Sequence, residues 1–201
     1  MTATIACTMD EHVVIVGAGP AGLAATWAIR RAGLDPLVVE QADAVAASWR
    51  ARHDHLRLNT HRMFSYQPGA RIPRRCGPYP GRDDYAAYLQ DYASGMRLRL
   101  GTRVHRIDRT DGGWALALAG GSLTAAHVVI ATGSDAEPVM PNWPGLESFG
   151  GAVSHAGRFR NVAKFAGLDV LVVGRVTPVS TCSATWPAAT RAGSGCRRAR
   201  A

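Results

Sequence analysis

A glycine-rich turn near the amino terminus, Gly17-Ala18-Gly19-Pro20-Ala21-Gly22, constrains the fold more than any other feature. It has GxGxxG spacing and follows a run rich in β-branched residues that predicts a strand over His12–Gly17. A helical pattern over residues 20–32 comes next, and Gly33 is placed to end it. Leu37–Glu40 predicts a second strand. A strand, a helix and a strand within about 30 residues are typical of the right-handed βαβ unit of α/β folds.

Each glycine of this turn has a predicted mechanical role. Gly17 makes the tight turn, Gly19 lets the backbone approach a pyrophosphate, and Gly22 lets the helix pack on the strand. The helix start offers free N–H groups and the positive end of its dipole to phosphates. Glu40, at the end of the second strand, can accept both hydroxyls of a ribose and disfavours a 2′-phosphate. The sequence thus predicts a site for FAD or NAD, with a glycine turn kept only for packing as the alternative.

The rest of the chain favours one sheet and the beginning of another. Prolines make residues 44–80 irregular, and Asp83–Tyr92 predicts a helix. Between Arg97 and Ala131, turn signals separate short strand-like pieces, which predict a small antiparallel insert returning to the main sheet. These pieces are Arg103–Ile107, Trp114–Leu118, Ser122–Thr124 and Val128–Ala131. Leu168–Val173 predicts a strand that resembles the opening of a second dinucleotide-binding unit.

The net charge of +8 is concentrated at the carboxyl terminus, where residues 175–201 hold five arginines and no acid. Removing those five charges leaves +3 for residues 1–174, which argues against a nucleic-acid partner. No apolar run approaches the roughly 20 residues of a membrane span, and the first residues lack a secretory signal. We therefore expect a cytoplasmic protein with no membrane partner.

The cysteines and histidines offer no metal-ligand spacing. The four cysteines are Cys7, Cys76, Cys182 and Cys196, and no two of them form a CxxC pair. Histidines such as His53, His55 and His61 have no neighbours that complete a tetrahedral set. We expect free thiols and no metal site.

Four further stretches carry a family resemblance: Ser48-Trp49-Arg50, Leu56-Arg57-Leu58-Asn59-Thr60, Tyr79-Pro80-Gly81-Arg82-Asp83-Asp84 and Val129-Ile130-Ala131-Thr132-Gly133. With the glycine-rich turn, they resemble the flavin-containing monooxygenase family, in the bacterial branch related to Baeyer–Villiger monooxygenases. The pattern Phe149-x-Gly151-x-x-x-His155-x-x-x-Phe159-Arg160 is similar to that family's own fingerprint. Its Phe159-Arg160 ending looks more like the branch that oxygenates nitrogen or sulfur atoms.

The resemblance implies an α/β fold: a Rossmann-like, three-layer FAD-binding domain whose parallel sheet carries a small antiparallel insert, plus the first strand of a second dinucleotide-binding domain. It implies an FAD- and NADPH-dependent monooxygenase that inserts one oxygen atom from O2 into a small organic substrate through a peroxyflavin. By position it assigns cofactor contacts to Gly17, Gly19, Pro20, Gly22, Glu40, Gln41, Trp49, Asn59, Val104, Thr132 and Gly133.

Three of these assignments carry more detail or an alternative. Val104 would meet the adenine through its backbone, and Asn59 would lie near the reactive edge of the flavin as the only candidate catalytic residue. Asn59 could instead be a turn residue that caps local backbone, and Trp49 a partly buried aromatic. His155 is expected to be structural. Thr26 departs from the family, which usually has Gly or Ala there.

After Gly174 the chain leaves the family pattern, which continues with a second GxGxxG that binds NADPH. Here Arg175-Val176-Thr177-Pro178 follows, and Pro178 would disrupt the expected helix. One base inserted after a permitted Gly174 codon would restore Gly-Ala-Gly-Asn-Ser-Gly. We therefore hypothesise a frameshift near Gly174, real or from sequencing, that leaves the NADPH site lost or incomplete. Resequencing the codons for Val172 to Thr181 tests this hypothesis.

The expected domains are an FAD-binding domain over 1–145, a linker and the start of an NADPH-binding domain over 146–174, and an aberrant, disordered tail over 175–201. Two other functions stay open. One is an inactive, truncated FAD-binding fragment. The other is a different NAD(P)H-dependent flavin oxidoreductase, although a flavin disulfide reductase would need a redox cysteine pair that the sequence lacks.

Overall fold

The computed structural model describes residues 10–134, 137–173 and 192–194. The chain divides into two compact units: unit 1 is Met1–Ala51 with Leu58–Ala136, and unit 2 is Arg52–Arg57 with Glu137–Ala201. Gly174 and the tail expected to be aberrant lie outside the described residues, apart from 192–194.

Unit 1 is built on a six-stranded mixed sheet with the strand order β3-β2-β1-β6-β5-β4. Its strands are β1 (Glu11–Val16), β2 (Leu37–Val39), β3 (Arg97–Arg99), β4 (Val104–Thr110), β5 (Gly113–Leu118) and β6 (Gly121–Ile130). β1 pairs in parallel with β2 and β6, and β2 pairs in parallel with β3. β4, β5 and β6 form an antiparallel meander. The predicted parallel sheet with a small antiparallel insert is confirmed.

One strand prediction was wrong, because a single strand, β6, joins the predicted pieces Ser122–Thr124 and Val128–Ala131 and ends at Ile130. Ala125, in the gap between them, is fully buried and pairs with Glu11 of β1 and Trp114 of β5. The sequence Ala125-Ala126-His127 lacks the β-branched residues that signal a strand. Partners on both sides, rather than local propensity, keep β6 continuous through it.

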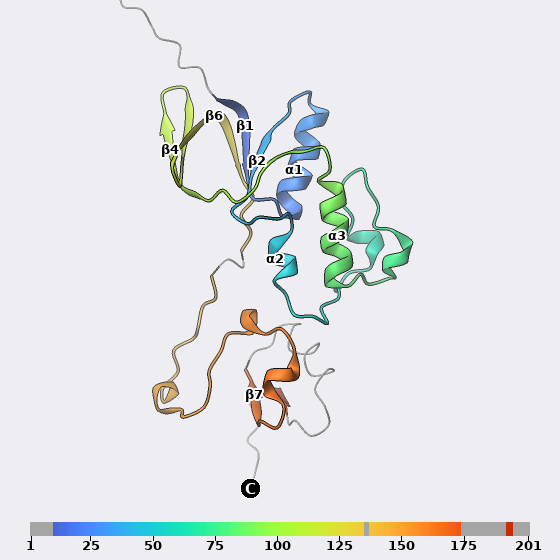
Figure 1. Cartoon of the computed structure of the whole chain (residues 1–201), viewed down its shortest axis with the longest axis vertical. Coiled ribbons are helices and arrows are strands. Elements are labelled where there is room, and N and C mark those ends of the chain that lie inside the picture. Colours follow the sequence, from blue (N-terminus) through green and yellow to red (C-terminus); the bar gives the residue numbers. More distant parts are fainter. Residues whose placement is uncertain (1–9, 135–136, 174–191, 195–201) are drawn as a thin grey trace, which may run out of the picture. The chain divides into compact units, whose positions relative to one another are not determined.

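The described residues of unit 1 form the α-helices α1 (Pro20–Arg31), α2 (Ala47–Arg50) and α3 (Arg82–Tyr92). Pro20 is the first residue of α1, and Gly33, with a φ of 84°, follows its end. α1 and α3 lie on the same side of the strands of unit 1 (Figure 1). α2 lies inside the segment predicted to be irregular, which also holds two 3₁₀ turns, η1 (Arg62–Phe64) and η2 (Arg74–Cys76).

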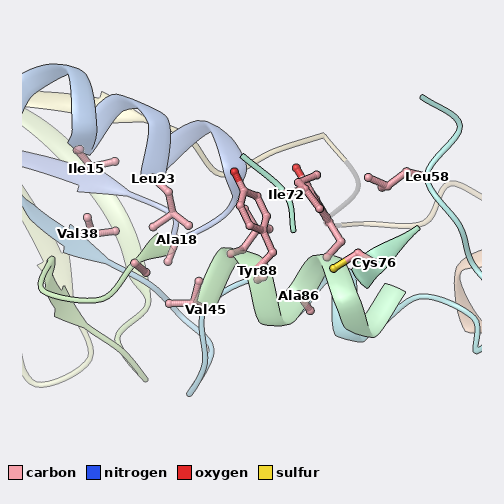
Figure 2. Packing of buried hydrophobic residues seen from close by; sticks show 14 residues of the cluster. Ile15, Ala18, Leu23, Val38, Val45, Leu58, Ile72, Cys76, Ala86 and Tyr88 are labelled. Carbon is pink, nitrogen blue, oxygen red and sulfur yellow. The ribbon is translucent and has the colours of Figure 1, made fainter. Parts of the chain in front are cut away.

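Apolar side chains bury both faces of this sheet, as alternation along β1 illustrates. Ile15 points into the cluster between the sheet and helices α1 and α3, with Leu23 and Val38 (Figure 2). Leu89 of α3 belongs to the same cluster. Val14 and Val16 join a second cluster with Leu116 and Leu123 of the meander; the members of both clusters are buried. The helices, the sheet and the meander therefore give unit 1 a core on each side of β1.

Thr26, the departure from the family pattern, is fully buried in α1. Its hydroxyl donates a hydrogen bond to the carbonyl oxygen of Gly22 at 2.9 Å. A buried polar group must be paired to avoid a desolvation cost, and this bond within the helix provides the partner. The substitution of threonine for a smaller residue is therefore accommodated.

Unit 2 has short elements and little buried surface. They are η3 (Leu146–Ser148), η4 (Ala156–Arg158), η5 (Val162–Phe165) and β7 (Val170–Val172), which pairs in parallel with β8 (Ala192–Ser194). β7 lies within the strand predicted over Leu168–Val173. Among the residues of unit 2 whose burial is described, His53 alone is buried. Within the described parts of the whole chain, no helix has the length and apolar character to cross a bilayer.

Candidate functional site

The predicted nucleotide-binding residues meet at one edge of the sheet of unit 1. β1, β2 and β6 run in parallel, so the turn after β1, Glu40 after β2 and Ala131–Gly133 after β6 leave the sheet at the same end. The N–H of Gly17 donates to the carbonyl of Val39 at 2.8 Å, and the N–H of Ala131 donates to that of Val16 at 2.9 Å. β1 lies between β2 and β6 in the sheet, and open α/β sheets bind ligands outside the carboxyl ends of their parallel strands.

The three glycines of the turn lie in different surroundings. Gly17 has a φ of 112°, and a Cβ atom there would overlap the carbonyl oxygen of Ala131. A Cβ atom on Gly22 would overlap the carbonyl oxygen of Gly17, so both positions exclude side chains by packing within the protein. A Cβ atom on Gly19 would meet nothing within 4 Å. Gly19 therefore faces open space, as a residue that lets a ligand approach the backbone would.

The start of α1 is suited to an anion. Its N-cap residue, Gly19, makes no side-chain capping hydrogen bond, and its first turn has no acidic residue. α3, by contrast, carries Asp83 and Asp84 in its first turn. Acidic side chains there satisfy the positive end of a helix, so their absence from α1 leaves that end available to phosphate.

The Glu40 side chain connects the glycine-rich turn to the end of β2 through a hydrogen bond. One carboxylate oxygen, Oε2, accepts a hydrogen bond from the N–H of Ala18 at 2.7 Å, and Oε1 accepts one from the N–H of Ala42 at 2.9 Å. A carboxylate has about four acceptor positions, so capacity is left for a ligand. The sequence alone indicates only a ribose contact for Glu40, because nothing local signals a contact 22 residues along the chain.

Residues 14–176 match the family described as pyridine nucleotide-disulphide oxidoreductase. The chain belongs to this family. A curated relative, indole-3-pyruvate monooxygenase YUCCA1 of Oryza sativa subsp. japonica, is 39% identical over 173 residues, which are 83% of this chain and 43% of the relative. The probable indole-3-pyruvate monooxygenase YUCCA4 of Arabidopsis thaliana is 34% identical over 166 residues, covering 80% of this chain and 40% of that protein.

A solved structure, the flavin-containing monooxygenase from Stenotrophomonas maltophilia, has a TM-score of 0.84 and 29% identity. The match covers 92% of this chain and 58% of that one. Within the family, these relatives confirm the predicted resemblance to flavin monooxygenases. The chain spans about two fifths of the length of these two curated relatives.

Trp49 lies on α2 against the helical layer of unit 1. Its ring is 4.7 Å from that of Tyr85, at an interplanar angle of 71°. Burial raises the pKa of Tyr85, and a hydrogen bond from the Gln67 side chain partly opposes this rise. The N–H of Ala46, next to α2, donates to the carbonyl of Ala18 at 3.2 Å, which links this segment to the glycine-rich turn. Trp49 is therefore partly buried, and its contact with a cofactor stays a prediction.

The remaining predicted contacts are more exposed. Asn59, Gln41, Thr132 and Gly133 all have exposed side chains or backbones. Asn59 follows Leu58, whose N–H donates to the carbonyl of Pro80 at 2.9 Å. Within the described residues the Asn59 side chain has no hydrogen-bond partner, so the structure gives no support to the alternative that it caps local backbone. Val104 opens β4, and its own predicted contact through the backbone is likewise untested.

The contacts of His155 and Cys76 are typical of structural residues. His155 accepts a hydrogen bond from the N–H of Gly157 at 3.0 Å and precedes η4, as a capping residue does. Cys76 is a buried free thiol, and burial raises its pKa. In the described parts of the chain, no three His, Cys, Asp or Glu side chains cluster as metal ligands would.

Proposed function

We propose that this chain forms the FAD-binding part of an FAD- and NADPH-dependent monooxygenase that transfers one oxygen atom from O2 to a small organic substrate. The observation that carries the proposal is the meeting of the glycine-rich turn, Glu40 and Thr132-Gly133 at the carboxyl edge of the parallel strands. The monooxygenase names of its relatives support the reaction class. A cytoplasmic location is part of the proposal.

The residues at this edge fit a dinucleotide such as FAD. Gly19 leaves its backbone open, and the uncapped start of α1 offers N–H groups to a pyrophosphate. Glu40 would accept hydrogen bonds from the ribose while holding Ala18 in place. When bound, the flavin would supply the redox chemistry with NADPH and O2. The protein's own residues bind and orient the cofactor.

The substrate preference rests on Phe159-Arg160. This ending favours oxygenation of nitrogen or sulfur atoms over Baeyer–Villiger chemistry. In unit 2, the Phe159 ring is 6.0 Å from those of His53 and Phe165, and the carbonyl of Arg160 accepts a hydrogen bond from the N–H of Asp54 at 2.9 Å. Asn59 is the residue we propose near the reactive edge of the flavin.

A second candidate is a chain that binds FAD without turning over. The lack of buried apolar side chains in the described part of unit 2 favours this alternative, because a reductant site needs a packed scaffold to hold it. The two candidates share the FAD site and differ only in whether NADPH reduces the bound flavin.

The test is to load the full chain with FAD and then add NADPH in the presence of O2. Retained flavin with oxidation of NADPH, and formation of a sulfoxide from an added thioether, would support the monooxygenase. Retained flavin without NADPH oxidation would support the second candidate. The matched control is Gly19→Val, whose Cβ atom would meet no protein atom within 4 Å, and flavin bound equally by that variant would contradict the proposed site.

A further inference from the structure

A pocket separate from the glycine-rich turn lies between two walls of unit 1. Its volume is about 240 Å³. The first wall comprises Arg99 at the end of β3 with Gly101, Thr102 and Arg103 before β4. The second comprises residues 118–122, which are the end of β5, the turn and the start of β6. We propose that this pocket binds a small organic phosphate.

The charge of the pocket selects an anion. Arg99 and Arg103 both line it, and no Asp or Glu does. Within the described residues, neither arginine side chain forms an ion pair or a hydrogen bond. A phosphate monoester carries about −1.5 to −2 charges at neutral pH, which matches two guanidinium groups better than a single carboxylate does. Guanidinium groups also bind phosphate oxygens through paired N–H donors.

The first wall is fixed before any ligand arrives. The N–H of Thr102 donates to the carbonyl of Glu40 at 2.8 Å, and that of Gly101 donates to the carbonyl of Ala42 at 2.7 Å. The carbonyl of Arg99 accepts from the N–H of Glu40 at 2.9 Å. Because these bonds hold the backbone between the two arginines, binding needs to order only their side chains.

The second wall is a tight hairpin turn. Leu118 pairs with Gly121, and Ala117 pairs with Ser122. Cβ atoms added to Gly101, Gly120 or Gly121 would meet nothing within 4 Å, so these glycines leave the pocket open on both walls. The hydroxyl groups of Thr102 and Ser122 add polar contacts to the lining.

The volume limits the size of the ligand. A water molecule takes up about 30 Å³ in the liquid, so the pocket has room for a phosphate and a small carbon body. It lies below the range of about 300–1,000 Å³ for drug-sized ligands. A phosphorylated three-carbon compound is the class that fits both its size and its charge.

The experiment is calorimetric titration of the full chain with glycerol 3-phosphate, and glycerol, which lacks the phosphate group, is the control ligand. We expect the phosphate to bind and glycerol not to bind. Arg103→Gln and Arg99→Gln should each weaken binding about tenfold or more, since each removes a charge-assisted contact. Arg106→Gln is the matched control, because Arg106 carries the same charge on β4 and does not line the pocket.

Two further arms keep this site apart from the proposed FAD site. Gly19→Val fills the space at the glycine-rich turn, and saturating FAD would occupy it. Phosphate binding that survives both supports the separate pocket. Binding abolished by Gly19→Val or by FAD, an equal loss in Arg106→Gln, or no binding by the unaltered chain would overturn the inference. The Gly19→Val arm decides the question even if the chain does not bind FAD.

Discussion

Units 1 and 2 differ in how far their own residues bury their apolar side chains. In unit 1, strands of the sheet carry buried residues on both faces, against helices on one side and the meander on the other. In unit 2, no apolar side chain of the described segment is buried, and Leu171 of β7 is 74% exposed. Both units contain a strand rich in aliphatic residues, β1 in unit 1 and β7 in unit 2, but among the described residues only β1 has layers on each face.

This difference shows that a strand signal and a packed strand are separate properties. A strand becomes stable when other layers cover it, and β1 has such layers within unit 1. β7 pairs with β8, but the described residues of unit 2 supply no buried apolar layer. The match covers 43% and 40% of the two curated relatives, so more than half of each relative lies outside it.

The largest expected effect comes from truncating a side chain in the core of unit 1. Leu23→Ala should lower the free energy of unfolding by about 2–5 kcal/mol, because Leu23 is fully buried and its loss leaves a cavity. Leu171→Ala in unit 2 should change it by less than about 0.5 kcal/mol. Urea denaturation followed by circular dichroism measures both. Equal losses in the two variants would break the comparison between the units.

The next prediction compares two glycines of the same turn. Gly22→Ala should destabilise unit 1 by about 1–3 kcal/mol, since its Cβ would overlap the carbonyl oxygen of Gly17 and force backbone to move. Gly19→Ala should leave the unfolding free energy nearly unchanged, because its Cβ meets no atom of the protein. Thermal unfolding of both variants without ligand checks this. A Gly19→Ala variant as unstable as Gly22→Ala would show that packing alone requires both glycines.

Glu40→Gln should weaken the hydrogen bond that connects the end of β2 to the glycine-rich turn. The neutral glutamine side chain lacks the charge that strengthens the hydrogen bonds from the N–H groups of Ala18 and Ala42. Its NH2 group would also replace one of the two accepting oxygens and face an N–H donor. We expect a cost of about 1–2 kcal/mol in the unfolding free energy. Hydrogen exchange at the Ala18 and Ala42 amides should quicken in this variant. Glu147→Gln, in η3 of unit 2, serves as the matched control and should leave both amides as protected as before.

Local sequence signals account for much of unit 1. β1, α1, β2 and α3 were predictable, because each has its own hydrophobic period and a glycine or proline near its boundary. The continuity of β6 and the short strand β3 were not, since both depend on partners elsewhere in the chain. The same holds for the candidate site. The spacing of Gly17, Gly19 and Gly22 was readable, while the contact between Glu40 and Ala18 required the fold.

The smallest expected effect concerns tyrosine ionisation, which reports on unit 1 alone because all five tyrosines lie there. Burial, with a smaller contribution from Tyr88, raises the pKa of Tyr92 from 10.0 to about 12, and its hydroxyl donates to the carbonyl of Pro68 at 2.8 Å. Between these pH values the unfolded chain releases the proton and the folded chain keeps it. The stability that Tyr92 contributes is therefore complete below pH 10 and declines as the pH rises toward 12.

Tyr92→Phe should make the alkaline fall in stability shallower, and it should remove a phenolate ionisation near pH 12 from an ultraviolet titration. At neutral pH the lost hydrogen bond to Pro68 should cost about 1 kcal/mol. Tyr66→Phe is the control, because Tyr66 is 43% exposed and the loss of its hydroxyl should leave the stability at neutral pH nearly unchanged. If the stability of Tyr92→Phe falls at alkaline pH as steeply as that of the unaltered chain, a group other than Tyr92 causes the fall. Because unit 2 has no tyrosine, a change that tracks the phenolate signal can come from unit 1 only.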